Sequence, residues 1–330
     1  MKKILSLLLA CLLALGMMSG CQPNNATADT AKIASVGDAV ITVGEMKYAV
    51  GVVKSSLTVG KEGQALEDFW NTLIDGVDPE DYIRDNAIDL LVDMAVFAQV
   101  AKEHGISVTD DEINQYFDQN KETITNITEQ FGVTEDTLKE IYRKQLLYDK
   151  YGQTVLATDE RFNPSEEVLK DYFAKNFYKA QHILKMTVDS ATNAPLTQAE
   201  KDAARAEIDT ILLAIRDGAD FEEMMLSHTE DPGVEQAPQG YVFTEGEMVP
   251  EFYEGTIALA EGQVSDVIES SYGYHIIKRL PLDAEAEFQT NAYNVQTAYV
   301  YAMEEQLLEE LKTTYEISID DAKLKEIPVK

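Results

Sequence analysis

Apolar residues recur with helical spacing through most of the first half of the chain. Residues 79–103 and residues 135–151 carry apolar side chains at the i, i+4 and i+7 positions that form one buried face of a helix. A Thr-x-x-Glu spacing, which is typical of helix starts, stands at Thr42 and again at Thr109. Residues 33–41 instead carry two short apolar runs around a glycine and predict a β-hairpin. The pattern therefore predicts a hairpin followed by a mainly helical region.

Glycine and proline mark the limits of two helices. Gly105 stands where it can end the helix of residues 79–103 in a left-handed turn. Pro164 precedes Ser165 and Glu166, and we expect it to occupy the first position of a further helix.

A different pattern occupies residues 180–280, where short apolar runs alternate with helical stripes. The predicted elements are a strand over 180–188, a helix from 197 to 218, a shorter helix from 220, a strand over 241–244, a helix over 250–259 and a hairpin over 267–277. This order, β-α-α-β-α-β-β, distinguishes the segment from the helical region before it.

Beyond Pro281 the pattern becomes helical again. Residues 284–311 carry apolar side chains along one side, and residues 315–319 alternate like a short strand. A helix that is apolar on one side must bury that side. The sequence leaves its partner open between the N-terminal region, the preceding segment alone and a second copy of the chain.

The net charge of the chain excludes one class of binding partner. The formal net charge at pH 7 is −32, and so acidic a surface repels the phosphates of nucleic acids. We therefore expect no nucleic-acid partner. The length of 330 residues allows two domains, and a hydrophobic content of 45% is that of a globular protein.

Candidate chemistry for a metal or cofactor is absent from the sequence. Cysteine occurs only at Cys11 and Cys21, so the rest of the chain contains neither a cysteine nucleophile nor a cysteine-based zinc site. The helical region also lacks a nucleotide-binding loop, a His-Glu-x-x-His motif and a Gly-x-Ser-x-Gly motif. The sequence predicts no cofactor and no metal.

The N-terminus has the form of an export signal. Two lysines precede an apolar run that is too short to span a bilayer comfortably, as in a signal peptide. Met18-Ser-Gly-Cys21 resembles the bacterial lipoprotein cleavage box, which implies a signal peptide over 1–20 and acyl chains on Cys21 that anchor the chain in a lipid bilayer. Residues 21–30 then form a flexible tether. The alternative is a plain secretory signal in which Cys21 is incidental.

Four blocks between residues 180 and 280 resemble the parvulin-type peptidyl-prolyl isomerase domain. They are Ala-Gln-His182-Ile-Leu-Lys, His228-Thr-Glu-Asp231-Pro-Gly, Phe243-Thr-Glu-Gly-Glu-Met248-Val-Pro-Glu-Phe252 and Ser271-Tyr-Gly-Tyr-His275-Ile-Ile-Lys. The resemblance implies an α+β fold, in which a four-stranded antiparallel sheet is covered by helices.

The flanks resemble, more loosely, the helical chaperone region of extracytoplasmic foldases of the PrsA and SurA types. That resemblance implies a chaperone region over 31–176, an isomerase domain inserted over 177–283, and a C-terminal helix and strand over 284–330 that pack with the N-terminal region. It also allows a homodimer.

The resemblance implies roles for particular residues. His182 and His275 occupy the positions of the paired histidines on neighbouring central strands. Asp231 stands where the family carries a residue facing the substrate carbonyl, and Ser270 where a hydroxyl supports the second histidine. These four are the expected catalytic residues.

The expected substrate-binding residues include a departure from the family. Met248 and Phe252 occupy the proline-pocket positions. The family's Gly-Asp-Leu-Gly-x-Phe is replaced by Pro-Gln-Gly240-Tyr241-Val-Phe243, so glycine takes the place of the leucine that walls the pocket. Tyr241, which we expect to line the site with Phe243, either fills that gap or narrows the slot.

The predicted function is that of a membrane-anchored isomerase and chaperone at the extracytoplasmic face of a bacterial membrane. Its partners are unfolded exported proteins with unmodified X-Pro bonds, because residues 187–194 lack the basic side chains that would select phosphate. The alternative is a non-catalytic holdase that binds unfolded polypeptide through a degenerate parvulin fold. A solute-binding lipoprotein is a third candidate, but it needs alternating α/β lobes that the helical first half does not provide.

Overall fold

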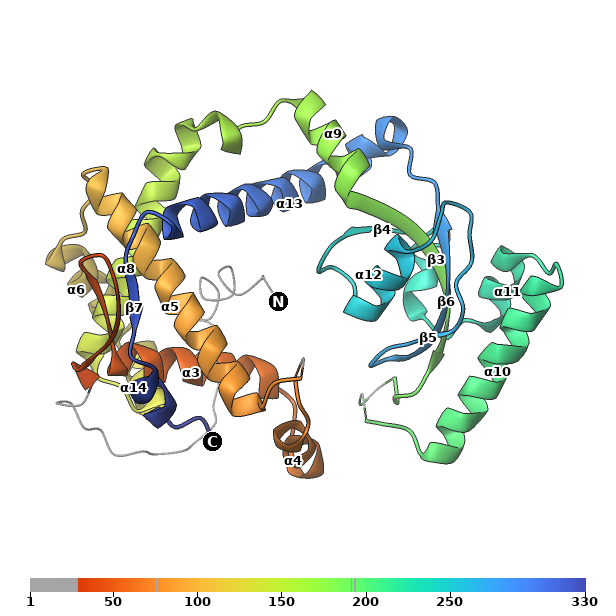
Figure 1. The fold of residues 1–330 in the computed structure, drawn as a ribbon, viewed down its shortest axis with the longest axis horizontal. Coiled ribbons are helices and arrows are strands. Elements are labelled where there is room, and N and C mark those ends of the chain that lie inside the picture. Colours follow the sequence, from red (N-terminus) through yellow and green to blue (C-terminus); the bar gives the residue numbers. More distant parts are fainter. Residues whose placement is uncertain (1–28, 75, 191, 193) are drawn as a thin grey trace. The chain divides into compact units, whose positions relative to one another are not determined.

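The computed structural model describes residues 29–330 except 75, 191 and 193. Its contacts divide the chain into two compact units. The insert unit is residues 164–301, and the helical unit comprises the described residues up to 163 together with 302–330 (Figure 1). The predicted signal peptide, Cys21 and most of the predicted tether lie outside the described residues.

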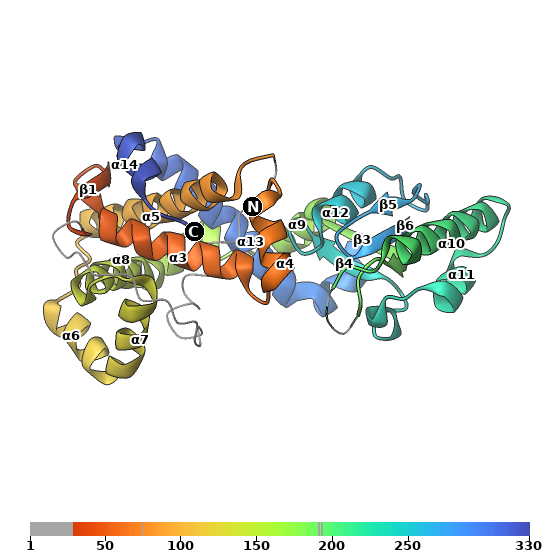
Figure 2. The same ribbon diagram turned by 90° about the horizontal axis from the view of Figure 1, so that it is seen from below.

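The helical unit is built around three long helices. Helices α3 (Val43–Thr58), α5 (Pro79–Glu103) and α8 (Glu135–Thr154) lie side by side (Figure 2). The shorter helices are α4 (Gly63–Asn71), α6 (Asp110–Gln119), α7 (Lys121–Phe131) and the 3-10 turns η1 (Leu156–Thr158) and η2 (Glu160–Phe162). The predicted Thr-x-x-Glu starts at Thr42 and Thr109 are both capping boxes, and Gly105 follows α5 with a φ of +75°.

A small antiparallel sheet joins the two ends of the described chain. Strands β1 (Lys32–Val36) and β2 (Ala39–Thr42) form the predicted hairpin. Strand β7 (Ile317–Ile319) pairs with the other edge of β1, which gives the order β2-β1-β7. Helix α14 (Asp321–Glu326) follows, and the chain then buries Ile327 and Val329 in the same core as β1, α3 and α5.

The folded part begins earlier than the predicted end of the tether. Asp29 is 1% exposed, and its Oδ1 accepts a hydrogen bond from Lys47 Nζ at 2.6 Å. The described fold therefore includes residues 29 and 30, which the sequence assigned to the tether.

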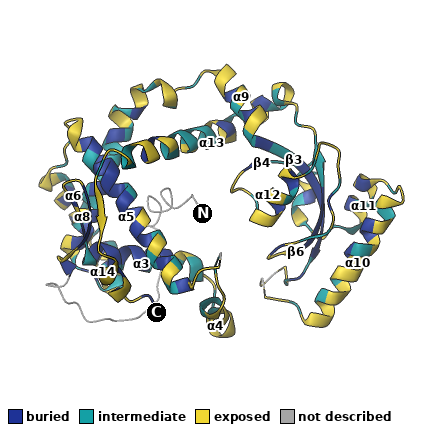
Figure 3. Ribbon diagram, in the orientation of Figure 1, coloured by how far each residue is buried: buried dark blue, intermediate teal, exposed yellow. Residues whose placement is uncertain are grey.

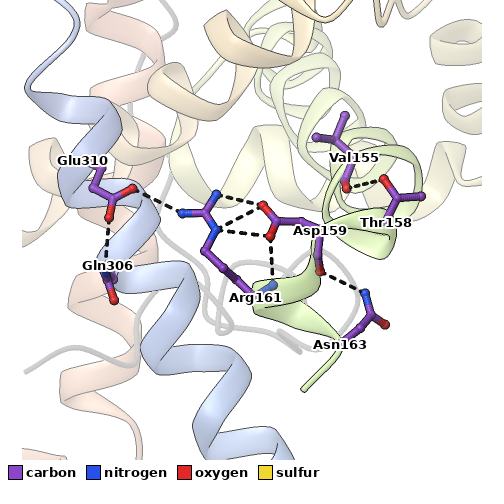
Figure 4. Close-up of polar contacts among 7 residues, drawn as sticks. All are labelled: Val155, Thr158, Asp159, Arg161, Asn163, Gln306 and Glu310. Atoms are coloured by element: carbon purple, nitrogen blue, oxygen red, sulfur yellow. Dashed lines mark hydrogen bonds and ion pairs between the residues drawn. The ribbon is translucent and has the colours of Figure 1, made fainter. Parts of the chain in front are cut away.

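Polar contacts anchor the last turns of the helical unit before the chain passes into the insert unit. Arg161 in η2 binds Asp159 Oδ2 through Nη2 at 2.8 Å and Glu310 Oε2 through Nη1 at 3.2 Å (Figure 4). Asn163 donates to the Asp159 carbonyl at 3.1 Å. These bonds hold the end of this stretch against helix α13 (Ala284–Lys312), which carries Glu310.

The insert unit contains the predicted isomerase-like segment. Its elements are α9 (Glu166–Asn176), β3 (Phe177–Met186), α10 (Gln198–Arg216), α11 (Phe221–His228), the 3-10 turn η3 (Pro232–Glu235), β4 (Tyr241–Thr244), α12 (Pro250–Ile257), β5 (Ile268–Glu269), β6 (Gly273–Leu280) and the part of α13 up to residue 301. The strands form an antiparallel sheet in the order β4-β3-β6-β5. The predicted α+β fold and its element order are confirmed.

Helices cover both faces of this sheet, so its central strands are buried on both sides (Figures 1 and 3). Ile183 and Ile276 pack with α10 and α11. On the opposite face Ala180 and Ile277 pack with Phe252 of α12. Strand β3 can therefore present His182 on the α12 face while its neighbour Ile183 enters the other core.

Two boundaries differ from the sequence-based expectation. The N-cap of α9 is Ser165, whose Oγ accepts from the Val168 N–H at 3.3 Å, so Pro164 lies before the cap and not at the first helical position. The units divide after residues 163 and 301, whereas the sequence predicts divisions after 176 and 283. The physical reason is that Phe173 of α9 and Phe288 of α13 share a core within the insert unit.

No helix among the described residues has the length and apolar content needed to cross a membrane.

Candidate active site

Two histidines on neighbouring strands form the centre of the site. His182 lies on β3 and His275 on β6, in antiparallel strands that pair His182 with Ile277 and Leu184 with His275. The two Nδ1 atoms are 3.2 Å apart, and the rings are nearly parallel, with 19° between their planes. Both side chains are buried. The sheet register therefore brings together the two histidines that the sequence predicted to be partners.

Asp231 joins the far side of His182. The residue caps η3, and its Oδ1 accepts from the Gly233 N–H at 3.0 Å. Its Oδ2 lies 2.9 Å from His182 Nε2 and accepts from the Tyr241 hydroxyl at 2.6 Å. Burial alone would raise the pKa of Asp231, but the hydrogen bonds from His182, Tyr241 and Gly233 hold that pKa well below its usual range. Asp231 is therefore a carboxylate at neutral pH.

Ser270 joins the far side of His275. Its Oγ lies 2.7 Å from His275 Nε2 and accepts from the Tyr272 N–H at 3.2 Å. Ser270 follows β5, so the short β5–β6 hairpin holds the hydroxyl and the histidine next to each other. Burial is the first cause that lowers the pKa of His275 to about 4, and the neighbouring His182 adds to it. His275 is therefore neutral near pH 7.

These bonds have one consistent direction when both histidines are neutral. The Asp231 carboxylate can only accept, so His182 donates to it from Nε2 and keeps Nδ1 as an acceptor. His275 must then donate from Nδ1, which leaves its Nε2 to accept from the Ser270 hydroxyl. One hydrogen-bonded chain thus runs from Ser270 through both histidines to Asp231.

An apolar cluster adjoins this polar chain. The Phe252 ring meets the rings of His182 and His275 edge-on, at centroid distances of 5.0 and 5.6 Å. Phe252 and Phe243 are buried, whereas Met248 and Tyr241 pack against them and stay partly exposed. Phe243, at 1% exposure, supports Phe252 from within the cluster, so Met248 and Tyr241 offer the accessible apolar surface.

The departure at residues 240 and 241 has a backbone cause. Gly240 has a φ of +97°, and a Cβ there would lie 2.9 Å from the Ala180 carbonyl oxygen. A leucine cannot occupy this position on this backbone. Tyr241 begins β4 opposite Ala180, and its ring lies 5.8 Å from the His182 ring. The ring thus supplies a wall beside His182.

Sequence reasoning missed two contributors to the site. It did not predict that the Tyr241 hydroxyl would bind Asp231. It also missed Thr229, whose Oγ1 accepts from the N–H groups of Leu184 and Asp231 at 3.1 and 3.3 Å and so ties the aspartate loop to β3. The run Thr-Glu-Asp-Pro-Gly was a usable signal, because such residues form turns by binding nearby backbone N–H groups.

The remaining histidines stand at helix ends, and the described residues contain no cluster of metal ligands. His104 caps the end of α5 and His228 ends α11. Within the described part of the chain, no three histidine, cysteine or acidic side chains are placed to hold a metal ion.

Comparison with known proteins assigns the class of both regions. Residues 168–280 match the family described as the PPIC-type PPIASE domain, and residues 1–152 match the SurA-like N-terminal domain. The chain therefore combines a parvulin-like domain of the PPIC type with a SurA-like helical region, which confirms the predicted resemblance.

Individual relatives of this chain are named as foldases. The foldase protein PrsA of Caldanaerobacter subterraneus subsp. tengcongensis is 28% identical over 217 residues, covering 64% of this chain and 61% of the relative. The foldase protein PrsA of Oceanobacillus iheyensis is 33% identical over 186 residues, covering 53% of this chain and 54% of the relative. The chain thus spans less than two thirds of either relative. A crystal structure of the peptidylprolyl isomerase PrsA from Bacillus cereus is 20% identical, with a TM-score of 0.30, and the match covers 91% of this chain and 97% of that chain.

Proposed function

We propose that this chain catalyses cis/trans isomerisation of X-Pro bonds in polypeptides that are still folding. The observation that carries the proposal is the hydrogen-bonded chain of Ser270, His275, His182 and Asp231 beside an accessible apolar surface. The PPIC-type match over residues 168–280 supports the same activity.

The reaction requires rotation about an amide bond and no covalent attack. Amide resonance sets a barrier of about 20 kcal/mol, because rotation removes the partial double bond. A catalyst must therefore bind the twisted amide better than the planar one. In the planar amide, resonance places negative charge on the carbonyl oxygen, and in the twisted amide that charge returns to nitrogen. A carboxylate near the oxygen thus favours the twisted form.

The candidate residues divide between these tasks. Met248 and Tyr241, supported by Phe252 and Phe243, hold the proline ring by apolar contact. Asp231 faces the carbonyl of the substrate residue that precedes the proline, and its ionised carboxylate supplies the negative charge near that oxygen. His182, His275 and Ser270 keep that carboxylate oriented through the chain of hydrogen bonds.

The helical unit and the N-terminal signal support a role in the folding of exported proteins. The SurA-like helical unit acts as a chaperone portion that keeps unfolded exported proteins near the isomerase. The cleavage box at Cys21 supports a location on the extracytoplasmic face of a bacterial membrane, with acyl chains on that cysteine as the anchor. A homodimer remains part of the proposal by family analogy.

The test is acceleration of cis/trans exchange in a short unmodified Ala-Pro peptide, followed by NMR exchange spectroscopy with the full chain. We expect catalysis by the wild type and a loss of about tenfold or more in His182→Ala and Asp231→Asn, as for other groups that orient or stabilise a transition state. His228→Ala is the matched control, because this histidine ends α11 and has no contact with the hydrogen-bonded chain among those described.

Two outcomes would contradict the proposal. A folded wild-type chain that gives no acceleration would remove the enzymatic claim and leave the holdase. Equal activity in all three variants would place the catalytic site elsewhere.

A further inference from the structure

The Tyr241 hydroxyl has a more specific environment than a pocket wall requires. Its single proton is donated to Asp231 Oδ2 at 2.6 Å, and the same oxygen lies 2.9 Å from His182 Nε2. The hydroxyl and the imidazole therefore bind one carboxylate oxygen from two different strands, β4 and β3. Asp231 Oδ1 is held separately by the Gly233 N–H at 3.0 Å.

The turn after Asp231 leaves room for this hydroxyl. A Cβ built on Gly233 would meet Tyr241 Oη well inside van der Waals contact, with Asp231 Oδ1 next at 3.3 Å and the Tyr241 ring carbon Cζ at 3.4 Å. The backbone of Gly233 lies outside the left-handed region, so no dihedral angle demands glycine there. The tyrosine hydroxyl is the group that demands it.

We propose that Tyr241 is a positioning residue, whose hydroxyl fixes the Asp231 carboxylate so that His182 is held with its proton on Nε2. The inference rests on the proposed isomerase function and assigns Tyr241 a role beyond that of a wall. The Asp231 carboxylate accepts the His182 Nε2 proton, and His182 Nδ1 then accepts from His275, so a hydroxyl that holds the carboxylate in place maintains the direction of the whole hydrogen-bonded chain.

The polar groups that face Asp231 agree with this positioning role. It is faced by His182 from β3, by Tyr241 from β4 and by the Gly233 N–H from η3, with His275 of β6 one hydrogen bond further away. Burial and the hydrogen bond to Asp231 both raise the pKa of Tyr241, so the hydroxyl keeps its proton. That proton is committed to Asp231 and is not offered to the substrate carbonyl.

The first test is Tyr241→Phe in the full chain, which keeps the ring beside His182 and removes only the hydroxyl. We expect kcat/KM for the Ala-Pro peptide to fall about tenfold, the size typical of a lost hydrogen bond to a charged group. Tyr315→Phe is the matched control, because the Tyr315 hydroxyl also donates to a carboxylate, Glu103 Oε2 at 3.0 Å, but in the helical unit. An unchanged kcat/KM in Tyr241→Phe would show that the hydroxyl has no positioning role and that Tyr241 only lines the pocket.

The second test reads the tautomer directly and needs no turnover. The chain has four histidines, so selective 15N labelling resolves the ring nitrogens of His182. In the wild type we expect Nε2 to carry the proton, and in Tyr241→Phe we expect both ring nitrogens to shift toward averaged values. Identical His182 spectra in the two chains would overturn the inference, even if the wild type proved inactive and the proposed function had failed.

The third test uses the space at Gly233. Gly233→Ala should displace the hydroxyl and lower kcat/KM about tenfold, but it should add little in the Tyr241→Phe background, where the nearest ring carbon is 3.4 Å away. Losses that multiply in the double variant would show that the two residues act independently. If catalysis is absent, the same cycle can be read from the His182 resonances.

Discussion

Replacing Lys144 by methionine should destabilise the helical unit, because it leaves a buried carboxylate without its cation. The Glu45 side chain is 2% exposed, and Lys144, at 11%, forms an ion pair with Glu45 Oε1. Lys144 Nζ also donates to the Val40 carbonyl at 2.9 Å. Methionine keeps most of the length and apolar volume of lysine, so the substitution mainly removes charge and hydrogen bonding.

The magnitude follows from what remains around Glu45. Breaking a buried pair by removing one partner costs about 3–5 kcal/mol. The Glu45 carboxylate still accepts from the Thr42 N–H at 2.8 Å and from the Thr42 hydroxyl at 3.1 Å, which offsets part of that cost. We therefore expect Lys144→Met to lower the free energy of unfolding by about 3 kcal/mol. Glu45→Gln combined with Lys144→Met should recover most of the loss.

The assay is urea unfolding followed by the fluorescence of Trp70. This is the only tryptophan of the chain, and it packs against the core of the helical unit, so its emission reports that unit. Lys139→Met on the same helix is the control: its ion pair with Glu135 is far more exposed, at 26% and 58%, and should contribute less than about 1 kcal/mol. A Lys144→Met loss as small as that of the control would refute the reasoning.

Two further predictions concern the insert unit. The resonance of His275 should titrate near pH 4 and not near its ordinary pKa of 6.5. Between pH 4 and pH 6.5 this histidine binds a proton in the unfolded chain but not in the folded chain, so the free energy of unfolding should fall by about 3 kcal/mol as the pH drops from 6.5 to 4. A titration midpoint of His275 above pH 6 by NMR would contradict the prediction. Gly273→Ala places a Cβ against the Lys185 carbonyl at a φ of +152° and should lower the free energy of unfolding by about 3 kcal/mol. Gly262→Ala is the control: its φ is +79° and the space around its Cβ is open, so the loss should be about 1 kcal/mol. Thermal unfolding followed by near-ultraviolet circular dichroism compares the two, and equal losses would count against the clash.

The elements that the sequence predicted well are those whose signals are local. Helix α5 begins and ends at the predicted residues, because its buried stripe, its starting proline and Gly105 are all read within a few residues. Helix α4 was missed because it is short, and its few apolar residues, among them Phe69 and Trp70, pack only partly buried against the core. The resemblance implied that the C-terminal strand packs with the N-terminal region, but the register of β7 on β1 could not be predicted, since three residues contain no information about which strand edge they join.

The site was predictable to a similar extent. The motif blocks contained both histidines and Asp231, and the resemblance also pointed to Ser270, just before the last block; the antiparallel register then placed the two histidines in contact. The link from Tyr241 to Asp231 depends on the backbone at residue 240 and on the space at Gly233, which belong to the folded turn and not to any spacing in the sequence. The tertiary structure therefore adds the contact between Tyr241 and Asp231, which the sequence did not predict.

The division of the helical unit between two stretches affects the order in which the protein can be assembled. Residues 164–301 are contiguous, so a chain emerging from its N-terminus contains the whole insert unit before β7, Ile327 and Val329 exist. The helical unit must wait for these last residues to cover the edge of β1 and to complete its core. Until then that edge and the apolar residues beneath it are exposed, and a prematurely ended chain would carry a finished isomerase fold on an unfinished base, open to proteolysis and aggregation.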